Sequence, residues 1–104
     1  GFVDDARYAA LVVRQYAGKG YGSRRVRMEL LRRGLDRNVI EDALTEMPEQ
    51  DDTLDRLLRQ RLRGSLDRAD VKKASDALVR KGYGYDEISA ALHRLRVEAE
   101  DGLD

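Results

Sequence analysis

The chain of 104 residues has no cysteine, no tryptophan, and only one proline, one phenylalanine and one histidine. Without cysteine there can be neither a disulfide framework nor a thiolate metal site. No apolar stretch approaches the roughly 20 residues that a membrane-spanning helix needs, so we expect a soluble cytosolic protein with no membrane contact. No run of β-branched residues indicates a sheet. Because Leu, Arg and Ala are abundant instead, the composition predicts an all-α fold.

The formal net charge is zero, but charges of each sign are grouped along the chain. Residues 14–37 and residues 56–81 each carry +6, whereas residues 38–55 carry −7 and residues 82–104 carry −4. Blocks of one sign shape the local electrostatic field more than the average does. This pattern indicates a surface that meets a polyanion or a charge-patterned protein. The alternative is a set of solvated helix faces.

A short pattern recurs at a constant offset of 48 positions. Its members are Arg33-Gly34-Leu35, Ile40 and Ala43-Leu44, which return as Lys81-Gly82-Tyr83, Ile88 and Ala91-Leu92. Such a period is typical of tandem helical repeats, whose units are too small to bury their own apolar faces. We therefore predict two three-helix repeats, 1–48 and 49–104, in an elongated, curved helical array stabilised by the interface between them. A second echo, Lys19-Gly-Tyr-Gly22 and Lys81-Gly-Tyr-Gly84, has an offset of 62 and does not fit this register.

Capping residues and helix breakers predict the helix boundaries of the first repeat. The first helix should span about 5–17, with Asp4 or Asp5 accepting its free backbone N–H groups. Three glycines then interrupt the helix. Ser23 is expected to cap the second helix, and Gly34 is expected to end it in a left-handed conformation.

The remaining boundaries follow in the same way. The third helix should begin at Asp36 or Asn38 and end before Pro48. In the second repeat, Asp70 is expected to cap the middle helix. From about Glu98 the apolar period is lost, which predicts a frayed tail.

Helical spacing of apolar residues predicts the inward faces. In the first repeat the expected inward residues are Ala6, Ala9, Ala10, Val13, Ala17, Val26, Leu30, Ile40, Ala43, Leu44 and Met47. In the second repeat they are Leu54, Leu57, Leu58, Leu62, Ala74, Ala77, Leu78, Ile88, Ala91, Leu92 and Leu95.

The second helix carries the main candidate binding surface, because its face opposite Val26 and Leu30 is cationic. The glycine loop, the helix N-terminus and the guanidinium groups together suit a phosphate or carboxylate partner. For Tyr21, packing against its own loop and stacking on a base or partner side chain are both open. The candidate residues are Lys19, Tyr21, Arg24, Arg25, Arg27, Arg32 and Arg33, with Lys72 and Lys73 as weaker candidates in the second repeat.

The sequence offers no constellation for catalysis. His93 is expected on the exposed side of the last helix as an ordinary surface residue. The carboxylates of residues 49–55 lack the spacing of a calcium loop and fit helix capping better. We therefore expect no enzyme activity, no metal and no cofactor.

Several spaced motifs in the first repeat form one pattern: Asp4-Asp5-Ala6-Arg7-Tyr8-Ala9, Lys19-Gly-Tyr-Gly22, Arg25-Val26, Glu29-Leu30, Arg33-Gly34-Leu35, Ile40 and Ala43-Leu44. This pattern resembles the central repeat of the RecX family, regulators of the bacterial recombinase RecA. The second repeat resembles the C-terminal repeat of the family more loosely. The resemblance implies an all-α protein of three tandem three-helix repeats, of which this chain holds the second and third. The start at Gly1, without an initiator Met, fits a chain that begins inside a linker.

The resemblance also implies a function. RecX proteins bind within the helical groove of the RecA filament on single-stranded DNA, hinder its ATPase and strand exchange, and promote filament loss. It thus implies a cytoplasmic regulator of recombination, DNA repair and the SOS response, acting as a monomer on the RecA filament and single-stranded DNA. Without the first repeat, the chain would bind the filament weakly if that repeat helps to span adjacent subunits. Duplex DNA is expected as a further, weak partner. The alternatives are a stand-alone helical DNA-binding module and a generic protein-interaction scaffold.

Overall fold

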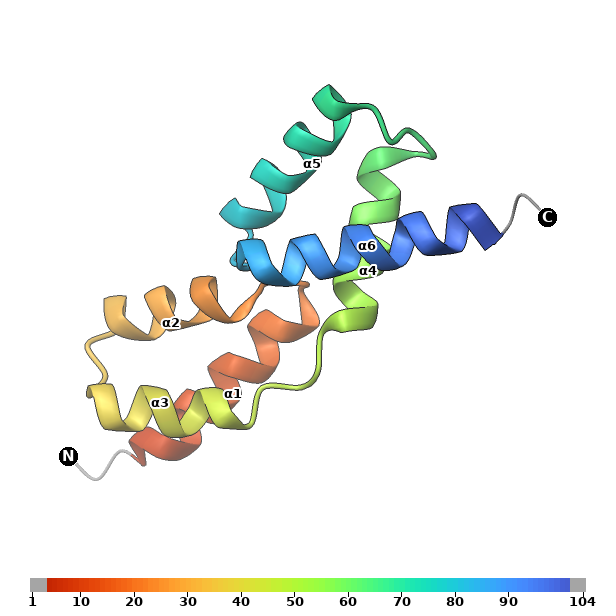
Figure 1. The fold of residues 1–104 in the computed structure, drawn as a ribbon. Coiled ribbons are helices and arrows are strands. Elements are labelled where there is room, and N and C mark those ends of the chain that lie inside the picture. The colour runs from red at the N-terminus through yellow and green to blue at the C-terminus, as the bar shows by residue number, and fades with distance from the viewer. Residues whose placement is uncertain (1–3, 102–104) are drawn as a thin grey trace.

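The computed structural model describes residues 4–101, which form six α-helices and no strand (Figure 1). The all-α prediction is confirmed. The helices are α1 (Asp5–Gly18), α2 (Ser23–Arg32), α3 (Arg37–Thr45), α4 (Asp51–Leu62), α5 (Arg68–Arg80) and α6 (Tyr85–Asp101). The molecule is elongated, with principal extents of 61 × 24 × 19 Å. Helices α1–α3 occupy one end and α4–α6 the other (Figure 1).

The buried apolar side chains form two separate clusters, and each is drawn from three consecutive helices. We call α1–α3 the first unit and α4–α6 the second unit. The first cluster contains Ala9, Val12, Val13, Val26, Leu30, Ile40 and Ala43. The second contains Leu54, Leu58, Leu62, Ala74, Leu78, Tyr83, Ile88, Ala91 and Leu92. The expectation that the units depend on their mutual interface for a core is wrong, because the three helices within each unit all pack against one another.

The 48-residue offset relates the last two helices of one unit to those of the other. The buried positions Leu30, Ile40 and Ala43 correspond to the buried positions Leu78, Ile88 and Ala91. Gly34 and Gly82 follow α2 and α5 with positive φ angles of 78° and 109°. Both glycines therefore end their helices as the repeat predicts.

Two predicted caps are wrong, while a third is confirmed. Asp4 accepts a hydrogen bond from the backbone N–H of Arg7 at 3.1 Å, as expected for a capping residue. Ser23 does not cap α2, because it is the first helical residue and Gly22 holds the capping position. Asp70 lies inside α5, which begins at Arg68, and its carboxylate accepts from the Ser65 hydroxyl.

The face that α1 buries differs from the predicted one. Ala6 is exposed, and Ala10 and Ala17 are only half-buried, whereas Val12 is fully buried. The larger valine fills space between the helices that an alanine would leave empty, so the buried stripe turns toward it. All other residues predicted to face inward are buried or half-buried.

Helix α6 continues to Asp101, beyond the predicted loss of order at Glu98. The Arg59 guanidinium on α4 donates a hydrogen bond to the Glu98 carboxylate, which ties this end of α6 to α4. The rest of the predicted frayed tail, residues 102–104, lies outside the described residues. Within residues 4–101, no helix is both long enough and apolar enough to cross a membrane.

Candidate nucleic-acid and partner interface

The two Lys-Gly-Tyr-Gly segments, residues 19–22 and 81–84, lie against each other and join the two units (Figure 1). We call this contact the glycine junction. The Gly22 backbone N–H donates to the Lys81 carbonyl at 2.9 Å, and the Arg24 N–H donates to the Gly82 carbonyl at 3.1 Å. The second bond satisfies one of the free N–H groups at the start of α2. A carbonyl of the second unit therefore does what Ser23 was expected to do.

The junction leaves no room for side chains at its two central glycines. An added Cβ on Gly22 would lie 2.4 Å from the Gly82 carbonyl oxygen. An added Cβ on Gly82 would lie 2.5 Å from the Arg25 Cβ. Both distances are far below van der Waals contact, so the backbones can approach this closely only because both residues are glycine.

Tyr83 links the second core to the first unit. Its ring is fully buried, and its hydroxyl donates to the Gly20 carbonyl at 2.9 Å. Burial, and to a smaller extent the Glu87 charge, raise the pKa of the Tyr83 hydroxyl from 10 to about 12, against the opposing effect of the Arg56 charge. Arg56 and Glu87 therefore lie close enough to the junction to act on it.

The outer face of α2 is exposed and cationic, as predicted. Arg24, Arg25, Arg27 and Arg32 are all exposed, and Met28 between them is 61% exposed. The Arg24 guanidinium extends beside Gly84, since its Nη2 would lie 3.3 Å from an added Cβ there. The start of α2 thus presents its cations next to the second unit.

Tyr21 is half-buried and packs against residues of α1, α2 and the second unit. Its ring centre lies 5.4 Å from that of Tyr16, at an interplanar angle of 41°. The Arg25 guanidinium carbon and the Lys81 Nζ lie 5.5 and 5.4 Å from the Tyr21 ring centre. Lys19 lies in the same way 5.6 Å from the Tyr16 ring centre. The Tyr21 ring is therefore packed in the structure, but against α1, α2 and the second unit and not against its own loop.

The cations toward the end of α2 have acidic partners. The Arg33 Nε donates to Glu29 at 3.0 Å, and its Nη1 donates to the Tyr8 hydroxyl at 2.6 Å. Arg32 pairs with the same Glu29 at 3.6 Å. The hydrogen bond from Arg33 holds the pKa of Glu29 below its ordinary 4.5. These arginines are therefore less available to an outside anion than those at the start of α2.

Arg27 and the two lysines of α5 complete the set of predicted site residues. Arg27 pairs with Glu41 of α3 at 3.2 Å. Lys72 pairs with Asp76 at 3.1 Å, and Lys73 is exposed beside Asp70. Both lysines lie in the half of α5 that points away from α2 (Figure 1). The structure thus brings together Lys19, Tyr21, Arg24 and Arg25, but it does not bring Lys72 and Lys73 to them.

Two cations at the junction, Lys81 and Arg56, are not among the candidate residues drawn from the sequence. Lys81 could have been found from the second Lys-Gly-Tyr-Gly segment, had that echo been taken as a sign of contact. No sequence pattern places Arg56 at the junction, because it comes near Tyr83 only through the packing of α4 in the second unit.

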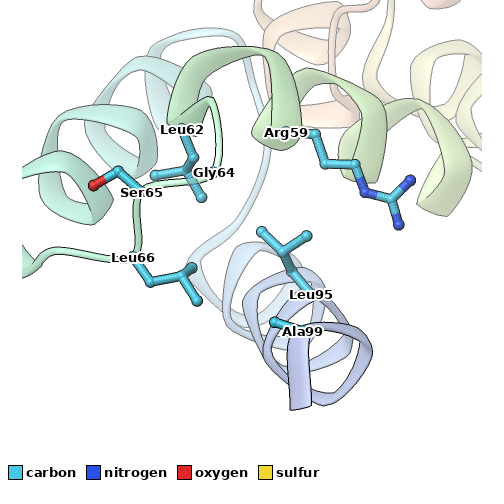
Figure 2. Close-up of a pocket in the computed structure, with 7 residues that line it drawn as sticks. All are labelled: Arg59, Leu62, Gly64, Ser65, Leu66, Leu95 and Ala99. Atoms are coloured by element: carbon cyan, nitrogen blue, oxygen red, sulfur yellow. The ribbon is translucent and has the colours of Figure 1, made fainter. Parts of the chain in front are cut away.

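The second unit also has an apolar hollow of about 320 Å³ between the end of α4, the loop after it and α6 (Figure 2). Leu62, Leu66 and Leu95 converge on it, and Arg59 lies at its edge (Figure 2). None of the predicted site residues lines this hollow. It is therefore separate from the cationic surface.

The acidic segment before α4 is used for structure. Asp51 and Asp52 occupy the first turn of α4, where carboxylates are stabilised by the helix dipole. Asp55 accepts from the Arg94 guanidinium at 2.7 Å and thereby ties α4 to α6. Over the described part of the chain, no group of three or more histidine, cysteine, aspartate or glutamate side chains is arranged to hold a metal ion. His93 is exposed, as predicted.

Comparison with known proteins agrees with the resemblance found in the sequence. Residues 4–44 match the second three-helix domain of RecX. The chain is 38% identical over 104 residues to the regulatory protein RecX of Xanthomonas oryzae pv. oryzae strain PXO99A, covering 97% of the chain and 62% of the relative. It is 37% identical over 94 residues to the regulatory protein RecX of Vibrio parahaemolyticus, covering 88% of the chain and 61% of the relative.

The chain thus spans less than two thirds of the length of these relatives. The matched segment contains the whole of α1 and α2 and nearly all of α3, including the cationic face of α2. The resemblance predicted from the sequence is confirmed. Residues 4–44 belong to the second three-helix domain of the RecX family, and the similarity to RecX regulatory proteins extends over most of the chain.

Proposed function

We propose that this protein regulates RecA-mediated homologous recombination. It binds in the groove of the RecA filament on single-stranded DNA and inhibits ATP hydrolysis and strand exchange. In this proposal it acts as a cytoplasmic monomer without catalytic activity, and residues 49–104 are the C-terminal repeat that follows the matched domain. The names of the relatives, which are regulatory proteins RecX, support the regulatory role.

The observation that carries the proposal is the exposed cationic face at the start of α2. Arg24 and Arg25 are exposed there and, within residues 4–101, form no ion pair with a carboxylate. Guanidinium groups that lack internal partners are available to phosphates or to carboxylates of another protein. A filament groove lined by both protein and DNA offers both kinds of anion.

The shape of the molecule also supports this role. An elongated body 61 Å long and 19–24 Å across can lie along a groove and contact more than one subunit of a filament. The glycine junction joins the two units by backbone hydrogen bonds, so the cations of α2 keep a fixed place relative to the second unit. Such preorganisation lowers the entropy cost of binding.

The experiment that tests the proposal measures ATP hydrolysis by RecA on single-stranded DNA. Wild-type protein should inhibit hydrolysis, and the triple variant Arg24→Glu, Arg25→Glu, Arg32→Glu should lose most of this inhibition. The matched control is Arg14→Glu, Arg37→Glu, Arg68→Glu, which makes the same change in net charge at exposed sites elsewhere. This control should inhibit like wild type. A triple α2 variant that inhibits as well as wild type shows that the cationic face is not the contact.

The second candidate function is a stand-alone DNA-binding module, which the unpaired arginines of α2 also favour. Such a protein would bind DNA without RecA. Its affinity would fall by roughly 10³–10⁵ between 50 and 200 mM salt if it made six to ten phosphate contacts. Binding of that kind, together with unchanged RecA ATPase, favours the second candidate over the first.

A further inference from the structure

Cations from both units gather around one pair of tyrosine rings at the glycine junction. Tyr16 and Tyr21 pack together, and Lys19 lies over the first ring. Arg25 from the first unit and Lys81 from the second both lie within 5.5 Å of the centre of the Tyr21 ring. Two positive charges that are 56 residues apart in the chain are thus neighbours in space.

Within residues 4–101 these cations lack an acidic partner, as do most of the lysines and arginines of the chain. In the described part of the chain, Arg27, Arg32, Arg33, Arg59, Lys72 and Arg94 form ion pairs, whereas Lys19, Arg25 and Lys81 form none. The nearest acid identified at the junction is Glu87, whose carboxylate accepts the Gly84 N–H at 2.9 Å. A group of like charges without partners repels itself, and a bound polyanion relieves that repulsion.

The backbone of the junction fixes where these charges stand. The Lys81 carbonyl accepts from the Gly22 N–H, which holds Lys81 against the start of α2. Gly82 in turn packs against the backbone and Cβ of Arg25. The aromatic rings hold the aliphatic and charged parts of the side chains by cation–π attraction while leaving their N–H donors free. The cluster therefore exists only when the two units are joined.

We propose that Lys19, Arg25 and Lys81 form a composite site for the phosphodiester backbone of single-stranded nucleic acid, built across both units. This inference deepens the proposed function, since it names the residues that would touch the DNA strand of the filament. A strand of regularly spaced phosphates can meet all three cations together, which one isolated carboxylate cannot do. Because the Tyr21 ring is already covered by Tyr16, Arg25 and Lys81, the site reads phosphates and not bases.

The test is the salt dependence of binding of the 104-residue protein alone to fluorescently labelled oligothymidine, measured by anisotropy. For single strands, the slope of log K against log salt concentration is about −0.7 per phosphate contact. Lys81→Gln and Arg25→Gln should each make the slope shallower by about 0.7, and the double variant by about 1.4. An oligoadenosine strand should give the same changes, because the bases are not read.

The matched control is Arg68→Gln, which removes an exposed cation from the same helix that leads into Lys81, at its opposite end. It should leave the slope unchanged. Circular dichroism should show that all variants keep wild-type helicity. Because Lys81 and Arg25 have exposed or half-exposed side chains outside both cores, these substitutions leave the folded units intact.

Three results would overturn the proposal: no binding of wild type at low salt, wild-type slopes for both variants, or an equal change of slope for Arg68→Gln. A polyglutamate competitor that displaces DNA at equal charge concentration would instead assign the cluster to an acidic protein surface. The RecA ATPase assay is read separately. If the chain binds DNA through this cluster but does not inhibit RecA, the proposed function fails while the composite site stands.

Discussion

Gly22 and Gly82 come from different units, yet an added Cβ on Gly22 would stand 2.4 Å from the Gly82 carbonyl oxygen. Around this contact run two backbone hydrogen bonds and the bond from the Tyr83 hydroxyl to Gly20. Since each unit has its own buried core, the contact does little to fold the units. Its consequence is that the two units keep one orientation.

Gly22→Ala should open the junction without unfolding either unit. The φ and ψ angles of Gly22, −83° and 168°, suit alanine, so the effect comes from the collision with the Gly82 carbonyl alone. We expect the Arg24 amide, which donates to that carbonyl, to exchange its hydrogen faster, as followed by NMR. Amides whose N–H groups lie in the middle of α1 and α4 should keep their exchange rates.

Gly34→Ala is the control for this variant. Gly34 has a positive φ of 78° but nothing within 4 Å of an added Cβ. Alanine there costs about 1–2 kcal/mol of backbone strain and touches no part of the junction. In Gly34→Ala, the hydrogen of the Arg24 amide should therefore exchange at the wild-type rate once the change in global stability is subtracted. Equal acceleration in both variants would contradict a tight contact at Gly22.

Leu30→Ala should strongly destabilise the first unit. Leu30 is fully buried in the first cluster, so its truncation should cost about 2–5 kcal/mol in lost burial and cavity formation. Its neighbour Leu31 is 55% exposed, and Leu31→Ala should change stability by no more than about 0.5 kcal/mol. Urea titration followed by circular dichroism measures both. Equal costs at the two positions would show that the register of α2 is wrong.

Tyr83→Phe should weaken the link between the units while keeping the second core. The ring stays buried, but the Gly20 carbonyl loses its hydrogen bond from the hydroxyl. A hydrogen bond of this kind contributes about 0.5–1.5 kcal/mol. Thermal unfolding at pH 7 should therefore show a small loss of stability relative to wild type. A variant as stable as wild type would indicate that the bond contributes nothing in solution.

Wild type and Tyr83→Phe also give a pH test, because the pKa of Tyr83 is raised from 10 to about 12, mainly by burial. A raised pKa means that folding favours the protonated hydroxyl, so this stabilisation is complete below pH 10 and is lost as pH rises toward 12. The stability difference between wild type and Tyr83→Phe should shrink over that interval. Other tyrosines and lysines titrate in both proteins and cancel. A constant difference from pH 9 to 12 would refute burial of the hydroxyl.

At low pH the relevant group is Glu29, whose pKa is lowered mainly by the hydrogen bond from Arg33. A lowered pKa stabilises the folded state above the unfolded value and the effect is lost as pH falls through the folded value. Wild type should therefore lose more thermal stability than Glu29→Gln between pH 5 and pH 3. Parallel losses in the two proteins would show that the carboxylate is not held by Arg33 in solution.

The sequence was sufficient to predict the six helices and the correspondence of buried positions between the two units. Periodic apolar residues and glycine stops gave the six helices, and the 48-residue offset matched Leu30 with Leu78 and Ile40 with Ile88. These features depend on local spacing and on burial, and both appear in the sequence as apolar residues at regular intervals. The family resemblance was carried by motifs in the same segment that the comparison matched.

The junction could not be predicted in the same way. Its hydrogen bonds join backbone atoms of Gly22, Arg24, Lys81 and Gly82. Because every residue except proline has the same backbone groups, such bonds produce no recognisable pattern of apolar residues in the sequence. The two Lys-Gly-Tyr-Gly segments do not occupy equivalent positions in the repeat, because they follow α1 and α5, which are not equivalent helices. The echo instead marks two surfaces that touch. The capping of α2 by Gly82 was missed for the same reason.

We propose that the start of α2 and the glycine junction face the RecA filament and its DNA. The most direct measurement is an electron cryo-microscopy reconstruction of RecA on single-stranded DNA saturated with this protein. We expect density for both units along the filament groove, with the α2 face and Lys81 turned toward DNA and the flanking RecA surface. Density outside the groove, or in the groove with α2 turned to solvent, would contradict it.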